Sequence, residues 1–588
     1  MHASARRAFS RRRPLSGAFF HLSVVRISVT ALSILSVPVI GRAQGGTGPA
    51  PTISAVLDAG GYTATIAQGS VFVIKGKNLC GSGAIFGGVP YSSAPLNNVK
   101  VTFTPATGGA GIDAYMVYTY GAGATTQVAA ILPSTVPAGE YNVTLANNGA
   151  VSPAFKTTVV AHKFGIISVN SSGAGRAVVQ NYISQTQYDL NRYTTGSLNG
   201  YPYSPAHAGQ IIVIWGTGLG PISSPDNIEP GALDLRQNLN IQVLIDGVAV
   251  NPDLYAGRAP TLPGADEIVL TLPANVSTGC LLSLQVSVNG QLSNSTTIAI
   301  ASGNDNVCTA PGITAAQLAT LDQGGKFSVG TLSIAGGTDA SGSTRIRVDA
   351  ASAIFVSLNA DELNAGTPAA TTPIVDNSCT VTRQIVTVPT TGSPNIPSFT
   401  ILGAGNLVLN GPNVSNAPIS IETLLNAKVN GVTVVNGAVL AAGDYTITGP
   451  GGKDVGPFQA AIMMSQPLLV ASTIPNPIPR GQDFAIRWTG GGTDTVTISG
   501  SASVAAPGST PTNVMVDSGV FRCVTTGDKG MFTVPGSILQ QLPAGKGSLT
   551  LSSNNKMTTF TAPLVAGGNL DYGYFYTGFQ NRFSTAYQ

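Results

Sequence analysis

The chain has 588 residues, enough for about four domains of ordinary size. Apolar residues make up 43% and charged residues only 9%, against roughly 25% charged in an average soluble domain, which excludes the charge-rich composition of a disordered chain. The formal net charge is +3, but seven arginines and no acids lie in the first 43 residues, and the other 22 basic and 26 acidic residues give −4. We therefore expect no nucleic-acid partner.

Residues 1–43 have the organisation of an export signal. An arginine-rich start precedes an apolar run over 27–40, and small residues flank a cleavage position after Ala43. This run is too short for a membrane span, and no later segment reaches about 18 consecutive apolar residues. Arg6-Arg7 leaves both the general and the twin-arginine export routes open. We predict a signal peptide over 1–43, a linker over 44–51, and a secreted or cell-surface protein with no membrane span in the mature chain.

A pattern of glycines and aliphatic residues recurs at an offset of 140 residues, where 68–79 returns as 208–219. Aliphatic residues alternate with polar ones between turn signals, which predicts antiparallel strands, and Asn148-Gly149 and Asn289-Gly290 predict tight hairpin turns. We therefore predict two tandem immunoglobulin-like antiparallel β-sandwich domains, over 52–162 and 165–302. The matched pairs include Gly69 and Gly209, Val73 and Val213, Ile74 and Ile214, Gly76 and Gly216, and Leu79 and Leu219.

The second copy contains an insert over 180–203, which is rich in Asn, Gln, Tyr and Ser. This composition predicts a long loop, and loops of this kind often carry binding sites. The next region, 312–458, does not align with the repeats and begins with a short helical pattern over 314–321. Strands separated by Asn-Gly turns follow it, so we predict a separate β-rich domain over 312–458.

The last region, 467–588, echoes the strand-and-glycine pattern of the repeats and ends in an aromatic tail. We predict a β-sandwich-like domain whose alternating Tyr572, Tyr574 and Tyr576 form a strand packed on it; a recognition tail for export or anchoring is the alternative. Helical periodicity is nearly absent from the whole chain. The predicted fold class is therefore all-β, with tandem immunoglobulin-like antiparallel sandwiches.

Five cysteines in an exported chain are free to form disulfides. Cys280 begins a predicted strand and Cys308 follows the next one, so the intervening hairpin turn brings them together, and we predict this bridge. Cys379 and Cys523 would have to pair across two predicted domains, which is the less favoured arrangement. Cys80 has no evident partner. The odd number leaves at least one thiol free or paired with another chain.

The second copy carries a specific pattern in which Trp215 begins the run WGTGLG, Leu272-Pro273 follow, and 288–293 read VNGQLS. This pattern resembles the repeated domain of uncharacterised secreted proteins of acidobacteria, which is similar to the IPT/TIG branch of immunoglobulin-like folds. The resemblance covers about 52–302 and implies an extracellular module with no chemistry and no catalytic residues of its own. The segment 486–535 resembles the C-terminal part of similar secreted proteins.

No catalytic, cofactor or metal motif is present in the sequence. His162 and His207 have no His, Cys or acid at ligand spacing, and we expect them at the surface. The chain has no G-x-S-x-G serine elbow and no phosphate loop followed by a helix. Asp361-Glu362 and Asp266-Glu267 are the candidate carboxylate pairs for glycosidase chemistry, and we expect them to be solvated. Asp246 with the latter pair lacks the series of acids that a calcium loop needs, so we predict no catalytic residue, cofactor or metal.

Trp215 and Trp488 occupy matching places in two strands, each shortly before a glycine-containing turn. An exposed tryptophan provides a stacking platform for sugar rings, whereas a buried one fills a sandwich core. We favour the core role, although the first copy has Lys75 where the second has Trp215, which leaves open that this position faces outward. Both residues stay as candidate ligand-contact aromatics.

These observations predict an exported, non-enzymatic array of β-sandwiches that binds or spaces at the cell surface, with an extracellular glycan or protein as its partner. Two alternatives remain. One is a polysaccharide-acting enzyme with its catalytic region in 312–458 and the repeats as accessories, which requires a cleft with two carboxylates about 5 to 9.5 Å apart. The other is a purely structural stalk.

Overall fold

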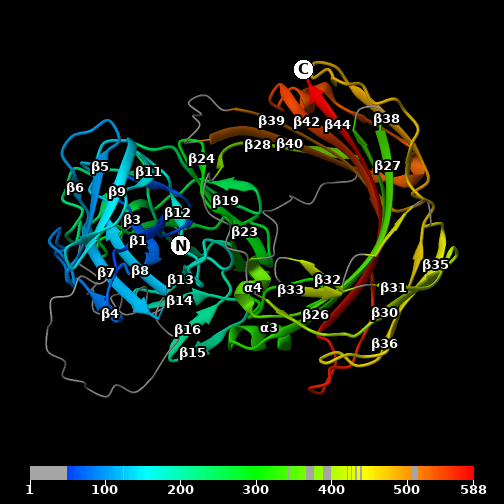
Figure 1. The fold of residues 1–588 in the computed structure, drawn as a ribbon, viewed down its shortest axis with the longest axis horizontal. Helices are drawn as coiled ribbons and strands as arrows, with labels where there is room; N and C mark the ends of the chain where they lie inside the picture. Colours follow the sequence, from blue (N-terminus) through cyan, green and yellow to red (C-terminus); the bar gives the residue numbers. More distant parts are fainter. Residues whose placement is uncertain are drawn as a thin grey trace.

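The computed structural model describes residues 49–588 apart from gaps at 124, 342–343, 366–376, 389–398, 420, 425–426, 431–432, 437–439, 506–513 and 556. The chain forms two small β-sandwiches, followed by a larger region built around one long curved sheet (Figure 1). The all-β prediction is confirmed. The predicted signal peptide, 1–43, and most of the linker, 44–51, lie outside the described residues.

The first repeat is an immunoglobulin-like sandwich. Its strands are β1 (Thr52–Asp58), β2 (Thr65–Ala67), β3 (Val71–Lys77), β4 (Gly83–Phe86), β5 (Val99–Pro105), β6 (Ile112–Asp113), β7 (Tyr115–Ala122), β8 (Thr125–Ile131), β9 (Gly139–Asn147), β10 (Ala150–Val151) and β11 (Phe155–Val160). One sheet has the order β1-β3-β8-β7-β4 and the other β2-β11-β9-β5-β6, with β2 parallel to the last strand. Tyr141, near the start of β9, donates its hydroxyl proton to the Pro137 carbonyl at 2.8 Å, which is the tyrosine corner of immunoglobulin-like domains.

The second repeat has the same topology with additional strands. Its strands are β12 (Gly165–Ile166), β13 (Val179–Ser184), β14 (Gln187–Asn191), β15 (Gly196–Leu198), β16 (Tyr201–Ser204), β17 (Ile211–Thr217), β18 (Leu233–Asp234), β19 (Ile241–Ile245), β20 (Val248–Val250), β21 (Tyr255–Arg258), β22 (Asp266–Thr271), β23 (Gly279–Val288), β24 (Gln291–Leu292) and β25 (Thr296–Ile300). One sheet has the order β15-β16-β14-β13-β17-β22-β21-β18, with β12 paired to β17. The other has the order β20-β19-β23-β24, with β25 paired to β23.

The insert over 180–203 is not a long loop, and that prediction is wrong. It supplies most of β13 to β16, which extend the sheet outward from β17. Its polar residues pair inside the fold: the Asn181 side-chain amide donates to the Ser204 carbonyl at 2.7 Å, and that of Asn191 donates to the Ala299 carbonyl at 2.8 Å. In the sequence, asparagines are typical of a loop. Here they are buried and form hydrogen bonds with each other and with the backbone, so they stabilise a sheet.

The two copies share a hydrogen bond at the end of their central strand. In the first copy the Thr126 hydroxyl accepts a hydrogen bond from the Leu79 amide, and in the second the Asp266 carboxylate accepts one from the Leu219 amide. Gly76 and the matching Gly216 lie against the first strand of each copy, where an added Cβ would approach a backbone oxygen to 2.0 and 2.6 Å. The repeated glycines therefore mark close approaches between strands.

The remaining chain contains the curved sheet and the strands that cover it. Its elements are α3 (Ala315–Asp322), β26 (Phe327–Ser341), β27 (Thr344–Leu358), α4 (Ala360–Ala365), β28 (Ser378–Val388), β29 (Thr400–Ile401), β30 (Leu407–Gly411), β31 (Val414–Ile419), β32 (Ile421–Leu424), β33 (Ala427–Asn430), β34 (Thr433–Asn436), β35 (Gly443–Gly449), β36 (Phe458–Met464), β37 (Leu469–Val470), β38 (Phe484–Thr489), β39 (Thr495–Ala505), β40 (Val514–Thr526), η1 (Gly527–Lys529), β41 (Met531–Val534), α5 (Gly536–Leu539), β42 (Gly545–Asn554), β43 (Thr558–Thr559) and β44 (Tyr572–Tyr587). The curved sheet has the order β28-β40-β39-β42-β44-β26-β27-β29, with β34 and β43 paired at its margins.

The predicted separation of 312–458 from 467–588 is wrong, because both segments contribute strands to the curved sheet. The last strand, β44, runs parallel to β26 from the Tyr572–Val329 pair to the Phe583–Ala340 pair. Pairing between strands more than 200 residues apart leaves no local signal, because the alternation of polar and apolar residues predicts a strand but not the strand with which it pairs.

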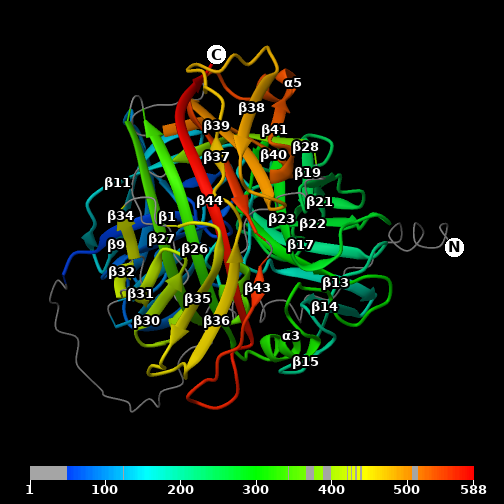
Figure 2. The same cartoon turned by 90° about the vertical axis from the view of Figure 1, so that its right-hand side faces the viewer.

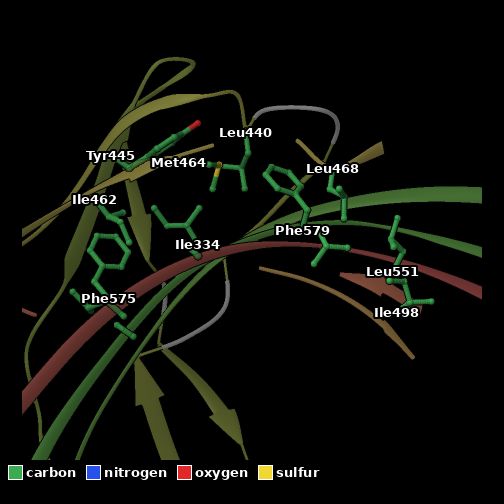
Figure 3. Packing of buried hydrophobic residues seen from close by; sticks show 14 of the residues in the cluster. Ile334, Leu440, Tyr445, Ile462, Met464, Leu468, Ile498, Leu551, Phe575 and Phe579 are labelled. Atoms are coloured by element: carbon green, nitrogen blue, oxygen red, sulfur yellow. The ribbon is translucent and has the colours of Figure 1, made fainter. Parts of the chain in front are cut away.

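One hydrophobic core contains buried residues from Leu332 to Tyr587. Alternate residues of the curved sheet point to its outer side, where β30, β31, β35, β36, β37 and β38 cover them (Figures 1 and 2). Figure 3 shows Ile334 of β26 and Phe575 of β44 next to Ile462 of the covering strand β36, and Phe579 next to Leu468. The aromatic tail is therefore a strand, as its alternation predicts, but Phe575, Phe579 and Phe583 enter the core, whereas the predicted Tyr572, Tyr574 and Tyr576 lie on the other face.

Two disulfides are present. Cys280 and Cys308 are joined across the start of β23 and the segment after β25, with Cα atoms 5.1 Å apart. Cys379 and Cys523 are also joined, contrary to expectation, because β28 and β40 are neighbours in one sheet and place these residues directly opposite each other. Cys80 is a free, buried thiol.

In the part of the chain that the structure describes, no helix is both long and apolar enough to cross a membrane.

Candidate functional site

Both tryptophans lie in apolar cores and are not stacking platforms. Trp215 is 5% exposed and its indole N–H donates to the Gln180 side-chain carbonyl at 2.9 Å. Trp488 is 3% exposed and donates to the Gly527 carbonyl at 2.9 Å. A buried tryptophan with its single donor satisfied has no face left for a sugar, so neither residue remains a candidate ligand contact.

Two of the acids considered for catalysis form ion pairs, and the pair of Asp361 joins two units of the molecule. Asp266 is completely buried and pairs with Arg258, so the expectation that it is solvated is wrong. Asp361, at the start of α4, accepts from Arg176 of the second repeat at 2.9 Å, and its neighbour Glu362 accepts from the Asn359 amide at 2.8 Å. Among the described residues, no group of three His, Cys, Asp or Glu side chains could hold a metal ion.

The first and second repeats meet through polar contacts. Asp226 accepts from the Ser134 amide at 2.6 Å and from the Ser134 hydroxyl at 2.7 Å, and Arg258 lies 3.8 Å from the same carboxylate. His162, expected at the surface as a linker residue, contacts the Leu219 carbonyl through its Nδ1 at 2.7 Å. Burial raises the pKa of Asp226, while the two bonds from Ser134 and the nearby Arg258 oppose that rise.

The insert strands of the second repeat hold the C-terminal region in the same way. Asp322, at the end of α3, accepts from the Thr194 amide at 2.8 Å and the Thr194 hydroxyl at 2.9 Å, and Arg176 lies 3.6 Å away. Tyr193 packs with Phe327 in an apolar cluster around the first disulfide. The predicted binding loop is therefore mainly a docking element.

The inner face of the curved sheet carries polar side chains in rows. Its strands alternate, so that one residue enters the core and the next faces the concave side, which is turned toward the two repeats in Figure 1. The backbone register aligns these inward residues in rows across strands β28, β40, β39, β42, β44 and β26. One such row consists of Thr380, Arg522, Ser499, Thr550, Arg582 and Asp339.

Neighbouring rows have the same character. Ser552 lies opposite Gln580, and Ser548 opposite Ser584, on the two central strands β42 and β44. Gln580, Arg582 and Ser584 are exposed, so this face is open to solvent. With strands about 4.8 Å apart, a row of six strands extends roughly 24 Å.

A strip of tyrosines borders these rows. Tyr572, Tyr574 and Tyr576 lie on the same face of β44, with ring centroids 5.6 Å apart for the first pair and 6.2 Å for the second. All three rings are half-buried, and Tyr576 is opposite Ser333 of β26. Rings, hydroxyls, amides and guanidinium groups thus share one concave surface, which is the mixture that recognises a neutral polyhydroxylated chain by stacking and hydrogen bonding.

Sequence reasoning missed this surface, although part of the signal is visible. The stretches 495–503 and 546–554 alternate aliphatic or small core residues with Ser, Thr, Lys and Asn, and the tyrosine alternation was recognised as a strand. The alternation does not predict which side chains lie next to one another on the sheet, because each row depends on the register of strands far apart in the chain.

No protein-family model matches the sequence, and no curated protein matches it. Solved structures similar to this chain include the I-band fragment I67–I69 of titin, which is 8% identical over 67% of this chain and 98% of the fragment, with a TM-score of 0.11. The chicken CNTN1 FN1–FN3 domains are 7% identical over 89% and 96%, at 0.12. The Bacteroides ovatus SGBP-B in complex with a mixed-linkage heptasaccharide is 10% identical over 85% and 95%, at 0.15.

Similarities at these TM-scores carry no argument about a ligand of this chain. The immunoglobulin-like character of the two repeats rests on their own strand order and on the Tyr141 corner.

Proposed function

We propose that this chain is an exported, non-enzymatic protein that binds extracellular polysaccharide on the inner face of its curved sheet. The observation that carries the proposal is the register-aligned row of hydroxyl, guanidinium and carboxylate groups across six strands, bordered by Tyr574 and Tyr576. Sugar rings stack on aromatic rings and exchange hydrogen bonds with such side chains without the need for a deep pocket.

The wider parts of the proposal rest on the sequence. The signal-like segment 1–43 supports export, and two disulfides fit an oxidising compartment. We also propose that the two repeats are IPT/TIG-like domains. A non-enzymatic role is supported by the use of Asp266 and Asp361 in ion pairs, which leaves neither of them available as half of a carboxylate pair.

Affinity electrophoresis tests the proposal. The mature protein from residue 44 is run through gels that contain soluble β-glucan, xylan, mannan or pectin, and we expect retardation by at least one of them. The double variant Tyr574→Ala/Tyr576→Ala should weaken polysaccharide binding by roughly thirtyfold, because two stacking contacts of about 1 kcal/mol each are lost.

The matched control is Tyr201→Ala, which removes a tyrosine that is 47% exposed on the second repeat. Its mobility shift should equal that of the unmodified protein. Retardation that survives the double variant, or that Tyr201→Ala also removes, would place the glycan elsewhere. A protein retarded by none of the polysaccharides would favour a structural stalk, and a polysaccharide shortened during the run would favour the enzyme.

A further inference from the structure

A second cluster of aromatic and polar side chains lies on the outer face of the second repeat, away from the curved sheet. Figure 2 shows its strands β13, β14, β17, β22 and β21 side by side. Trp215 of β17 and Glu267 of β22 are directly opposite each other in the register, and their side chains therefore share this face. Tyr188 of β14 and Tyr255 of β21 lie on the same face of the strands farther out.

The aromatic groups around Glu267 are held in place by their own contacts. The Trp215 indole is bonded to Gln180, as described above, and the Tyr188 ring meets the edge of Tyr182 at a centroid distance of 5.4 Å. The Tyr255 hydroxyl accepts from the Leu233 amide at 3.0 Å and donates to the Arg258 carbonyl at 2.5 Å. The cluster is therefore preorganised.

Glu267 is half-buried, its charge acts on the hydroxyls of both Tyr188 and Tyr255, and in the described chain it forms no ion pair. Arg258, on the adjacent strand, points to the opposite face and is engaged with Asp266. Burial, with a smaller contribution from the charge of Asp266, raises the pKa of Glu267 to about 7. A carboxylate in this position lacks the cation that would offset the cost of its burial.

The first repeat shows how the same position is completed internally. The residues that match Trp215 and Glu267 there are Lys75 and Gln127, which are also opposite each other. The Lys75 ammonium lies 4.7 Å from the centroid of the Tyr62 ring, and the Gln127 amide donates to the Tyr118 hydroxyl. The first copy thus carries its own cation over an aromatic ring, whereas the second has replaced that cation by an indole and the neutral amide by an acid.

We infer that the Glu267 face of the second repeat binds an organic ammonium ion from solution, with the carboxylate as its counter-ion and the surrounding tyrosine rings as its aromatic walls. An ammonium group next to a carboxylate and against aromatic faces gains both ion pairing and cation–π attraction. This inference does not depend on the glycan site, because the two surfaces share no residue.

Fluorescence of Trp215 tests the inference. Trp488→Phe leaves Trp215 as the only tryptophan, since the chain has two. Tetramethylammonium chloride is titrated into the mature protein at pH 8, with sodium chloride as the ionic-strength control. We expect a saturable change in emission that sodium does not reproduce. Glu267→Gln, which installs the residue of the first copy, should weaken binding by about tenfold or more.

The pH dependence distinguishes a binding site from an acid that is only structural. Affinity should fall as the pH is lowered through about 7, because protonation removes the counter-ion. Of the tyrosines on this face, Tyr182 packs against Tyr188, while Tyr188 and Tyr255 stay neutral in that range because burial raises the pKa of each. Asp266 faces the other side with Arg258.

Two further variants keep the test decisive. Glu140→Gln in the first repeat removes an acid outside the cluster and should leave the titration unchanged. Tyr188→Leu retains apolar bulk but removes a ring, and should weaken tetramethylammonium binding while Glu267 is still present. A titration without saturation at pH 8, or one that Glu267→Gln leaves unaltered, would overturn the inference.

Discussion

At the scale of single residues, the second repeat differs from the first by a buried ion pair between Asp266 and Arg258. Asp266 performs the role that Thr126 has in the first copy, since each accepts from the amide of the matching leucine, Leu219 or Leu79. A threonine needs no counter-ion, but a fully buried aspartate does, and Arg258 supplies it.

We expect Asp266→Asn to lower the free energy of unfolding by about 3–5 kcal/mol, because the Arg258 guanidinium would stay buried without its closest partner. Urea unfolding followed by circular dichroism measures the change. Asp234→Asn is the control: Asp234 and Arg236 form an ion pair whose side chains are 33% and 30% exposed, and its loss should cost about 1 kcal/mol or less. Equal losses for the two variants would contradict this reading.

At the scale of elements, the Cys379–Cys523 bridge anchors an edge strand. Among the described strands, β28 has β40 as its one neighbour in the sheet order, and the disulfide closes a loop with a sequence separation of 144 residues. The end strand of a sheet exchanges and frays more readily than its centre, so a covalent link at this position stabilises the margin of the concave face.

Cys379→Ala together with Cys523→Ala should therefore lower stability by roughly 2–5 kcal/mol, since the unfolded chain regains the entropy of the open loop. Hydrogen exchange should show the loss first in β28, while the amides of β42 and β44 in the middle of the sheet remain protected. Uniformly faster exchange in all strands of the sheet would argue against a local anchor.

At the scale of the whole molecule, the units are docked rather than strung on linkers. Asp226 joins the repeats through Ser134, and Asp322 joins the second repeat to the C-terminal region through Thr194 and Arg176. Buried polar contacts at each junction couple the units, so that the concave face is held in a constant relation to the repeats.

Differential scanning calorimetry tests this coupling. The first and second repeats of the unmodified protein should unfold in one transition, and Asp226→Ala should separate it into two, because two hydrogen bonds to Ser134 and the charge near Arg258 disappear together. Ser134→Ala keeps the bond from its backbone amide and should have a smaller effect. Two transitions in the unmodified protein would contradict a coupled junction.

How much of this could be predicted follows from the range of each signal. Alternation over a few residues predicted the strands, including β44. The positions of Cys280 and Cys308 on either side of a hairpin turn predicted their disulfide. The loop prediction for the insert over 180–203 was wrong because the side chains of Asn181 and Asn191 hydrogen-bond to each other inside the fold, which composition does not reveal. The core role favoured for Trp215 agrees with its burial, but its partners on β13 and β22 became known only from the register of the strands.

The sequence by itself determined what is local and repeated: two small β-sandwiches, their turn glycines and their all-β character, since period-two alternation and backbone conformation are written residue by residue. Only the tertiary structure decided what depends on pairing between distant strands. It joined 312–458 and 467–588 in one sheet, aligned Arg522 with Arg582 in one row, and left Glu267 opposite Trp215 without an ion-pair partner among the described residues. Register is set by the packing of whole sheets, and a side chain's neighbours exist only after that register is fixed.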